Sequence, residues 1–547
     1  MKRAFILLLC GAALLACKKE ENGSGGGGQA DKPVTVVGTV SGGGTPLEGV
    51  VVSDGISCVK TGADGSYALP ADLDKSDFVF VSTPSGWSAP VEQGQAIFWK
   101  RTKDCQKGSD GKYVADFTLN KIADPEKFTI FIYADPQPRK NSGTVDKLAY
   151  KALECCEDMY DDMQELKASI TNQPVYGIGL GDIVHQDLTL LDKHKTGFAR
   201  TGISNYNIIG NHDQGHVLEQ PDTEASKGFE AKMGPVNYSF NLGKMHFLML
   251  DNMISPGPGS GKYSDECITG FTEDIWQFIQ NDLATVSNDT QVMVCAHSPM
   301  MWHLSEGTVS ERSGNYIDQL RGLLKRFSKA YVWAGHSHNT FNKVPADSPI
   351  ETHTLTRVTG ALWTNEYLST NGTPRGYVVF KYDNGTVSWK FKPIFYQRST
   401  HQSVAPDYTY RDWDYEDATV NGKATKKAKM KGDSGSWLDD SYQMQLFAPG
   451  VYEEGYVYAN VFMWDEQWDR PKLDGAYMNR VNKTDSRYSY SEKIITEYYH
   501  AKASWYSDVD LNNCVSIFRG FTDKVHGTGT VTVKDRFGET FSAKITW

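Results

Sequence analysis

The chain has 547 residues, of which 39% are hydrophobic and 22% charged, and its formal net charge is −11. This length exceeds what one hydrophobic core serves, so we expect about three domains. The acidic balance argues against a basic binding face, and we therefore expect no stable binding to nucleic acid. A phosphate-bearing substrate stays open, because bound cations can reverse the local field.

The first 17 residues predict an export signal. Two basic residues precede an apolar run from Phe5 to Leu15, which is too short to span a bilayer. The run leads into Leu-Leu-Ala-Cys ending at Cys17, which resembles the processing box of bacterial lipoproteins. That resemblance implies acylation of Cys17 and an exported, lipid-anchored protein on the outer membrane, in the periplasm or at the cell surface. An ordinary signal peptide with an incidental cysteine is the alternative. Residues 18–32 are glycine-rich and predict a flexible tether.

Residues 33–123 predict a small N-terminal β-sandwich module. Short strand-like runs such as Val34–Val40 alternate with Asp-Gly turns. The pattern resembles carboxypeptidase-regulatory or transthyretin-like modules, which implies support or presentation rather than chemistry. Cys58 and Cys105 both fall in this module, and whether they form a disulfide stays open.

Residues 124–395 predict an α/β domain, because apolar runs typical of strands buried on both faces alternate with helical patterns. The strand-like runs are Phe128–Ala134, Val175–Leu180, Tyr206–Ile209, Met245–Leu250, Val292–Ala296 and Tyr331–Ala334. The helical patterns cover Thr144–Ser169, Glu273–Leu283 and Ile317–Phe327.

Polar side chains follow these strand-like runs at the point where each ends. They are Asp135 with Gln137, Asp182, Asn211 with His212 and Asp213, His297, and His336 with His338. Each has an ordinary explanation by itself, such as a helix cap, a turn or a structural histidine. Those explanations give no reason for the residues to recur at successive strand ends. Because ligands bind at the carboxyl ends of strands in α/β folds, the recurrence predicts one shared site.

The donor types fit two divalent cations. One predicted site takes Asp135, Gln137, Asp182 and His338. The second takes Asp182, Asn211, His297 and His336. Asp182 would bridge them, since a carboxylate has two oxygens. Mixed carboxylate, amide and imidazole ligands suit Mn, Fe or Zn, and two cations about 3.5–4 Å apart can clamp a phosphoryl group and activate water.

The motifs D-x-Q, G-D, G-N-H-D, H and G-H-x-H, in this order, resemble those of the calcineurin-like metallophosphoesterases. The flanking regions resemble the bacterial lipoprotein subgroup with an N-terminal β-module and its own C-terminal domain. The resemblance implies a metallophosphoesterase-type β-sandwich flanked by helices, and the same metal ligands. It also makes His212 the residue that protonates the leaving oxygen and Asp213 the residue that holds its imidazole. Gln137 departs from the usual D-x-H, which favours Mn, Mg or Fe over Zn at that site.

The expected function is therefore hydrolysis of a small phosphoester, either a monoester or a diester, outside the cytoplasm. The attacking group would be a hydroxide held by both metals. Two alternatives remain: a binding protein on the same scaffold without turnover, and a surface glycan-binding lipoprotein. Further candidates for substrate contact are His185, His216, His303 and Arg312, whereas Asp251 and Asn252 end a strand with no ligand role.

Residues 396–547 predict a β-rich C-terminal domain with a high density of Tyr and Trp. Gly455–Phe462 and Thr528–Val533 alternate as strands do. The basic run Lys423–Lys431 predicts a solvated loop. Most of the aromatic side chains are predicted to lie in a core, while stacking on sugars or bases stays open.

Overall fold

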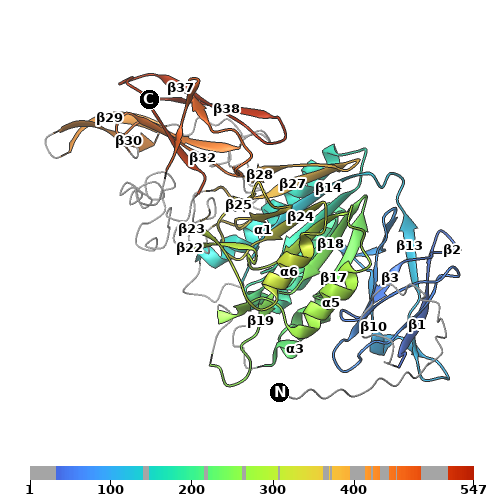
Figure 1. Ribbon diagram of the computed structural model, residues 1–547. Coiled ribbons are helices and arrows are strands. Elements are labelled where there is room, and N and C mark those ends of the chain that lie inside the picture. Colours follow the sequence, from blue (N-terminus) through green and yellow to red (C-terminus); the bar gives the residue numbers. More distant parts are fainter. Residues whose placement is uncertain are drawn as a thin grey trace, which may run out of the picture.

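The computed structural model consists of an N-terminal module, a central α/β part and a C-terminal β-rich part (Figure 1). It describes residues 33–139, 147–214, 220–261, 266–305, 308–360, 369, 373–394, 413–420, 423–430, 443–450, 453–481 and 515–547.

Two β-sheets pack face to face in the central part and are flanked by helices, which confirms the predicted fold class. One sheet has the order β28-β27-β14-β15-β16-β9-β8, with bounds Thr386–Pro393, Gly376–Asp383, Lys127–Tyr133, Val175–Leu180, Ser204–Ile208, Gln95–Ala96 and Val91–Glu92. The other has the order β17-β18-β21-β24-β26-β25, with bounds Tyr238–Leu242, Met245–Leu250, Gln291–Ala296, Lys329–Ala334, Ile350–Thr354 and Phe341–Lys343. Strands β14, β15 and β16 are parallel, as are β18, β21, β24 and β26.

Strand β14 is buried on both faces, as its apolar run predicts. Phe128, Ile130 and Ile132 point into the core between the sheets, whereas Phe131 and Tyr133 pack in a second core on the outer face. The ring of Phe128 lies 6.3 Å from that of Phe247 in the opposite sheet. The alternation follows from the two-residue period of a strand.

Helices cover the outer faces of both sheets (Figure 1). On the first sheet they are α1 (Lys147–Ser169) and α2 (Leu191–Thr201), and on the second α5 (Glu273–Leu283) and α6 (Ile317–Leu324). Two short helices, α3 (Asp222–Ala225) and α4 (Lys227–Met233), precede β17. The prediction for α5 is confirmed, whereas α6 ends before the predicted Phe327, whose N–H bonds to Leu324 in a closing turn.

The N-terminal module contains two small sheets. In the first, the strands are β11 (Gln106–Lys107), β12 (Tyr113–Val114), β1 (Val36–Gly42), β13 (Phe117–Lys121) and β7 (Trp87–Ser88), with β2 (Thr45–Pro46) and β5 (Ser66–Leu69) on β1. In the second they are β10 (Trp99–Arg101), β6 (Phe78–Ser82), β3 (Val51–Ser53) and β4 (Cys58–Lys60). Cys58 and Cys105 are free thiols.

The module is joined to the central part by strands and by shared core. Its strands β8 and β9 extend the first central sheet, because Gln95 in β9 pairs with Asn205 in β16. The ring of Phe98 lies 5.9 Å from Tyr206 and 4.6 Å from Tyr238. The two parts therefore form one continuous core.

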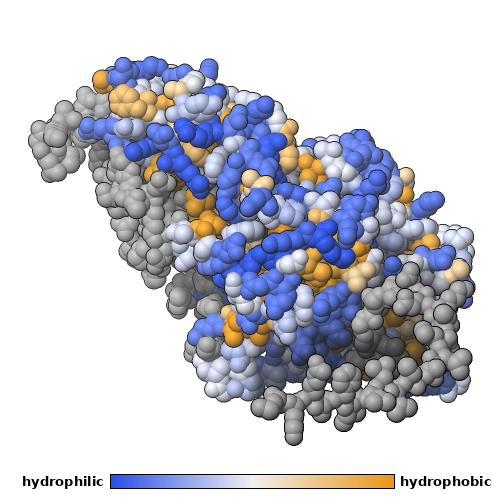
Figure 2. All heavy atoms as spheres, viewed as in Figure 1, coloured by the Kyte–Doolittle hydropathy of each residue, from blue (hydrophilic) through white to orange (hydrophobic). Residues whose placement is uncertain are grey.

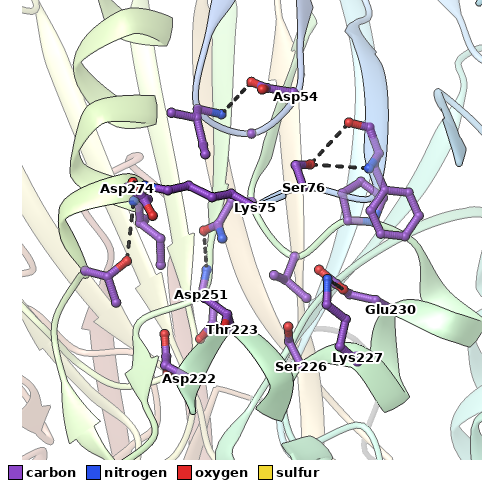
Figure 3. A pocket seen from close by; sticks show the side chains of 18 residues that line it. Asp54, Lys75, Ser76, Asp222, Thr223, Ser226, Lys227, Glu230, Asp251 and Asp274 are labelled. Carbon is purple, nitrogen blue, oxygen red and sulfur yellow. Dashed lines mark hydrogen bonds and ion pairs between the residues drawn. The ribbon is translucent and has the colours of Figure 1, made fainter. Parts of the chain in front are cut away.

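Polar groups complete this junction. Ser239 Oγ lies 2.8 Å from Ser82 Oγ of the module and 2.5 Å from Asp282, whose other oxygen lies 2.7 Å from His246 Nε2, and all of these side chains are buried. A pocket of about 110 Å³ lies between the module and helices α3 and α4 (Figure 3). Burial raises the pKa of two carboxyls that line it, Asp54 and Asp222.

The C-terminal part is β-rich, as predicted. Its paired strands are β31 (Met444–Phe447), β32 (Tyr456–Val461), β36 (Ile517–Phe521) and β35 (Asn479–Arg480), then β34 (Ala476–Tyr477), β33 (Lys472–Leu473), β37 (Thr528–Lys534) and β38 (Thr540–Thr546). Trp468 and Trp547 are buried and Trp464 is partly buried, so these aromatic side chains belong to the core. The face seen in Figure 2 is mainly hydrophilic, with apolar residues in separate spots.

The basic run Lys423–Lys431 is not a loop, which corrects the sequence prediction. Lys423–Met430 forms strand β30, paired antiparallel with β29 (Trp413–Val420). The register sets Glu416 opposite Lys427 and Asp417 opposite Lys426. The sequence prediction considered the basic run without the segment Trp413–Val420 that pairs with it.

Of the described helices, none combines the length and apolar character that a membrane crossing requires.

Candidate metal centre

The predicted ligands lie at one edge of the two packed sheets because parallel strands end there together. Asp135 and Gln137 follow β14, Asp182 follows β15, and Asn211 follows β16, three adjacent strands of one sheet. His297 follows β21, and His336 and His338 follow β24, which are neighbours in the other sheet. The structure brings all seven side chains into one cluster, in which five are buried and His336 and His338 are partly exposed, and no predicted ligand lies elsewhere.

The first group of ligands gathers around Asp135. His338 Nε2 lies 3.4 Å from Asp135 Oδ1. The Gln137 side-chain nitrogen donates to Asp182 Oδ2 at 2.7 Å. Ligand atoms of Asp135, Asp182 and His338 all lie within 4.8 Å of one another. This is the first predicted site.

The second group gathers around Asn211. Its Oδ1 lies 3.0 Å from His297 Nε2 and 2.9 Å from His336 Nδ1. Asp182 Oδ1 lies 3.3 Å from His297 Nε2. Asp182, His297 and His336 form a second set of ligand atoms within 4.8 Å. Asp182 belongs to both groups, as a bridging carboxylate must.

Backbone strain is concentrated at the cluster. Five ligands have positive φ: Asp135 (49°), Gln137 (41°), Asp182 (50°), His336 (62°) and His338 (54°). Residues other than glycine rarely adopt this conformation, which persists where the surrounding structure enforces it. The motif glycines provide the space, because a Cβ on Gly210 would lie 2.2 Å from Asp182 Oδ1 and one on Gly335 2.4 Å from Asp135 Oδ2.

The charges in the cluster are strongly coupled. Burial by itself lowers the pKa of His297, but Asp182 and Asp135 outweigh it and raise this pKa to about 10. Burial by itself raises the pKa of Asp182, but His297 and His212 hold it below its ordinary value. Burial, together with His297, lowers the pKa of His336 to about 3. A cation entering the cluster would therefore meet neutral His336 and displace a proton from His297.

The donor set and its packing fit divalent cations. Gln137 is fully buried, and its Oε1 has no hydrogen-bond partner among the described residues. A buried carbonyl oxygen without a partner is costly, and a cation beside it would remove that cost. Together the seven side chains offer two carboxylates, two amides and three imidazoles, a mixture of donors that suits divalent metals such as Mn, Fe or Zn.

Asn252 supports the centre, although the sequence analysis assigned it no role. Its amide oxygen accepts from the N–H of Ser298 at 3.0 Å and its nitrogen donates to the Ser298 carbonyl at 2.7 Å. This double contact fixes the chain next to His297. The Leu180 carbonyl lies 2.7 Å from His297 Nδ1, which leaves Nε2 to face the centre.

Arg357 is a second supporting residue that the sequence analysis missed. It is fully buried, and it donates to the carbonyl of Asp135 at 3.2 Å and to that of Gly360 at 3.0 Å. Burial lowers the pKa of Arg357 to about 10. Arg357 belongs to none of the sequence motifs, so only the fold shows that it supports the turn at Asp135.

The role expected for Asp213 is wrong. Its carboxylate accepts backbone N–H groups of Ile183, Val184 and Gly210 at 2.9–3.0 Å instead of holding the imidazole of His212. It thus ties the turn after β16 to the turn after β15. Burial, with Asp182 nearby, raises the pKa of Asp213 to about 7.

The other candidates for substrate contact separate into three cases. The ring of His185 lies 4.2 Å from that of His212. Arg312 Nη1 lies 3.4 Å from Ser298 Oγ, beside His297, and His303 is near enough for Arg312 to lower its pKa together with burial. His216 lies outside the described residues.

Comparison with known proteins identifies the family through the regions that flank this centre. Residues 34–122 match the model for the N terminal of calcineurin-like phosphoesterase, and residues 353–541 match the model for its C terminal. A search of the curated proteins finds no match. The chain belongs to the calcineurin-like phosphoesterase family.

Solved structures resemble the chain only distantly. A dimetal phosphatase from Danio rerio is 13% identical with a TM-score of 0.33, covering 49% of this chain and 97% of its own. A 5′-nucleotidase from Candida albicans is 15% identical with a TM-score of 0.30, covering 48% and 50%. A 5′-nucleotidase precursor from Thermus thermophilus is 11% identical with a TM-score of 0.27, covering 49% and 54%. The chain spans about half the length of both nucleotidases.

Proposed function

We propose that the protein hydrolyses a phosphoester with the aid of two divalent cations held by the seven clustered side chains. The observation that carries this proposal is the meeting of two ligand groups at Asp182, next to Gln137, whose buried carbonyl oxygen has no hydrogen-bond partner in the described part of the chain. Two cations held in this way would offset charge on the phosphoryl group and lower the pKa of a water molecule. Membership of a phosphoesterase family supports the reaction class.

The chain's own residues supply the proton for the leaving group. The N–H of His212 donates to Asp182 Oδ1 at 2.9 Å, and His212 Nε2 lies 4.0 Å from Asp182 Oδ2. The imidazole thus stands at the edge of the ligand cluster. As phosphorus bonds to the water oxygen, the leaving oxygen keeps the electron pair of the broken bond and takes the Nε2 proton of protonated His212. The proton that water loses restores the ring.

Arg312 supports an anionic substrate. In the described part of the chain its side chain forms no ion pair, and the one hydrogen bond of that side chain is to Ser298. Arg321 holds the backbone carbonyl of Arg312 with its guanidinium at 2.5 Å. A half-buried guanidinium without a carboxylate, next to a metal-ligand strand end, is suited to a phosphate oxygen.

The test is metal content together with hydrolysis by the purified full chain. We expect about two bound divalent metal ions per chain, and turnover of p-nitrophenyl phosphate or bis-p-nitrophenyl phosphate that a chelator abolishes and metal restores. Asp182→Asn should lose both metal and activity, whereas Asp383→Asn, on the exposed end of β27, should keep both. A wild-type chain that binds metal but hydrolyses neither ester would favour the non-catalytic binding protein.

We further propose that the enzyme is exported and held at a membrane by a lipid on Cys17. The support is the short apolar run that ends at the lipoprotein-like box. Cys17→Ser should move the protein from the membrane fraction to the soluble fraction of the cells that express it. Membrane association unchanged in this variant would contradict the proposal.

A further inference from the structure

The imidazole of His212 is held by the turn after β15. The side-chain nitrogen of Gln186 lies 3.4 Å from His212 Nδ1. The backbone N–H of the same residue donates to the His212 carbonyl at 3.0 Å. On another side the ring of His185 lies 4.2 Å from the His212 ring, tilted by 37°. One residue thus contacts both the backbone and the ring of His212.

The two ring nitrogens face in different directions. Nδ1 lies against Gln186, whereas Nε2 lies 4.0 Å from Asp182 Oδ2 at the edge of the ligand cluster. Which nitrogen of a histidine takes part in chemistry is set by the hydrogen bond that the other one makes. Asp213 does not make that bond here; its oxygens are directed at three backbone N–H groups instead.

We propose that Gln186 is the positioning residue for His212, the part that the sequence resemblance assigned to Asp213. This inference rests on the proposed function. A primary amide suits the part, because it donates to Nδ1 when that nitrogen carries a lone pair and, turned over, accepts from it when it carries a proton. In both orientations Nε2 stays directed at the leaving oxygen, and no charge is added beside the metal ligands.

The backbone of Gln186 supports this assignment. Its φ is +63°, in the left-handed region, and this conformation directs its N–H to the His212 carbonyl. Asp187 continues the turn by accepting from Thr189 N at 3.1 Å. The backbone bond of Gln186 to His212 is therefore followed directly by a turn that its own hydrogen bond closes.

The test compares leaving groups, because proton donation matters for a poor leaving group and little for a good one. Gln186→Met keeps the side-chain length and removes the hydrogen bond. Gln186→Asn keeps an amide that is too short, and asparagine tolerates positive φ. Each variant is assayed as the full metal-loaded chain on p-nitrophenyl and ethyl esters of phosphate. Gln214→Met is the matched control, since Gln214 belongs to the same turn as His212 but donates to the Met253 carbonyl at 2.7 Å.

General acid catalysis is typically worth 10²–10⁴-fold, so we expect both Gln186 variants to lower kcat on the ethyl ester by about 10- to 100-fold. On the p-nitrophenyl ester they should change it by less than about 3-fold, with metal content unchanged, and Gln214→Met should not alter the ratio of the two rates. A second measurement is the ¹⁵N NMR chemical shift of each ring nitrogen of His212 in the metal-free chain. Loss of the Gln186 contact should change these shifts.

The outcomes separate the two proposals. A wild-type chain that hydrolyses neither ester overturns the proposed function and this inference with it. An active wild type whose Gln186 variants lose both esters equally, or lose neither, overturns the inference alone. An unchanged ring signal in Gln186→Met also overturns it, whereas a selective loss on the ethyl ester with a shifted signal supports it.

Discussion

Asn252 follows β18 in the same way that His297 follows β21, and this shared position explains its role. The two strands are parallel, and Leu250 is paired with Ala296, so two residues further on Asn252 stands opposite Ser298. An amide there can hold both backbone groups of Ser298, as it does. The signal was present in the sequence, since a polar residue ended the Met245–Leu250 run, but its use depends on knowing which strands are neighbours.

We predict that Asn252→Ala weakens metal binding or activity by roughly 10- to 100-fold, as is typical when a partner that orients a metal ligand is lost. The change leaves two buried backbone groups of Ser298 without partners and releases His297. Metal titration of the purified variant measures the effect. The control is Asn281→Ala, which loses a hydrogen bond to the Ile56 carbonyl far from the ligands, and metal affinity reduced equally in both would contradict the prediction.

At the scale of single residues, the sequence identified the metal ligands better than their supporting contacts. Ligand residues stand in short motifs at strand ends, where the chain itself places them. Gln186, Arg357 and Asn252 act across turns that are distant in sequence, so their roles depend on backbone direction and packing. The positive φ of Asp182 likewise depends on the fold, because no local sequence pattern predicts it.

Two arginines contact carboxylates of helix α1, one in a buried ion pair and the other in an exposed one. Arg375 donates to Asp158 at 2.8 Å with both side chains about 1% exposed. Arg200 contacts Glu157 and Asp161 at 2.9 and 2.7 Å with its own side chain 42% exposed. Removing one partner of a buried pair leaves an uncompensated charge, whereas an exposed pair is screened by water.

We therefore predict that Arg375→Met lowers the free energy of unfolding by about 3–5 kcal/mol. The matched change Arg200→Met, in α2 but with both partners on α1, should cost less than about 1 kcal/mol. Urea unfolding followed by circular dichroism measures both. Similar losses for the two variants would show that the buried pair does not hold α1 on the sheet.

The hairpin β29–β30 shows the limit of reading one element alone. A run of lysines typically indicates a solvated loop, and that prediction failed because the pairing partner is an acidic run a few residues earlier in the chain. The six strands predicted inside the α/β part are all present, since buried strands carry their own apolar signal.

At the scale of the whole molecule, we expect the N-terminal module and the central part to unfold together, because they share one hydrophobic core. Phe98 → Ala removes a ring packed between Tyr206 and Tyr238, and we predict a loss of about 3–5 kcal/mol. Thermal unfolding should shift as one transition in fluorescence and circular dichroism alike. Val91→Ala, on the neighbouring β8 but 52% exposed, is the control with little expected change. A separate early transition that alone responds to Phe98→Ala would contradict the shared core.

The C-terminal part is tied to the central part by an ionic cluster around Glu351. This buried carboxylate lies 2.5 Å from Arg536 Nη2 and 3.2 Å from His353 Nε2, and it also contacts Lys329. Burial by itself raises the pKa of Glu351, but His353, Arg536 and Lys329 outweigh it and lower this pKa to about 2. The ionised form is therefore stabilised in the folded protein.

Because the folded pKa lies below the ordinary value of 4.5, the contribution of Glu351 to stability is present above pH 4.5 and is lost as the pH falls toward 2. We predict that the difference in unfolding free energy between wild type and Glu351→Gln, about 3 kcal/mol at neutral pH, shrinks over this range. Nearby Asp465, whose pKa burial raises to about 6 with a smaller contribution from Glu351, acts with the opposite sign. Urea unfolding at several pH values measures the difference, and a constant difference would contradict the prediction.

The sequence by itself determined six buried strands of the central part, the order of its motifs and the seven residues whose donor atoms suit metal ions. These are local properties, because apolar period and strand-end position are written in neighbouring residues. Only the tertiary structure decided that Asp213 binds backbone amides while Gln186 faces His212, and that β8 and β9 complete the central sheet. Those contacts join residues far apart in the chain, and packing rather than local pattern selects them.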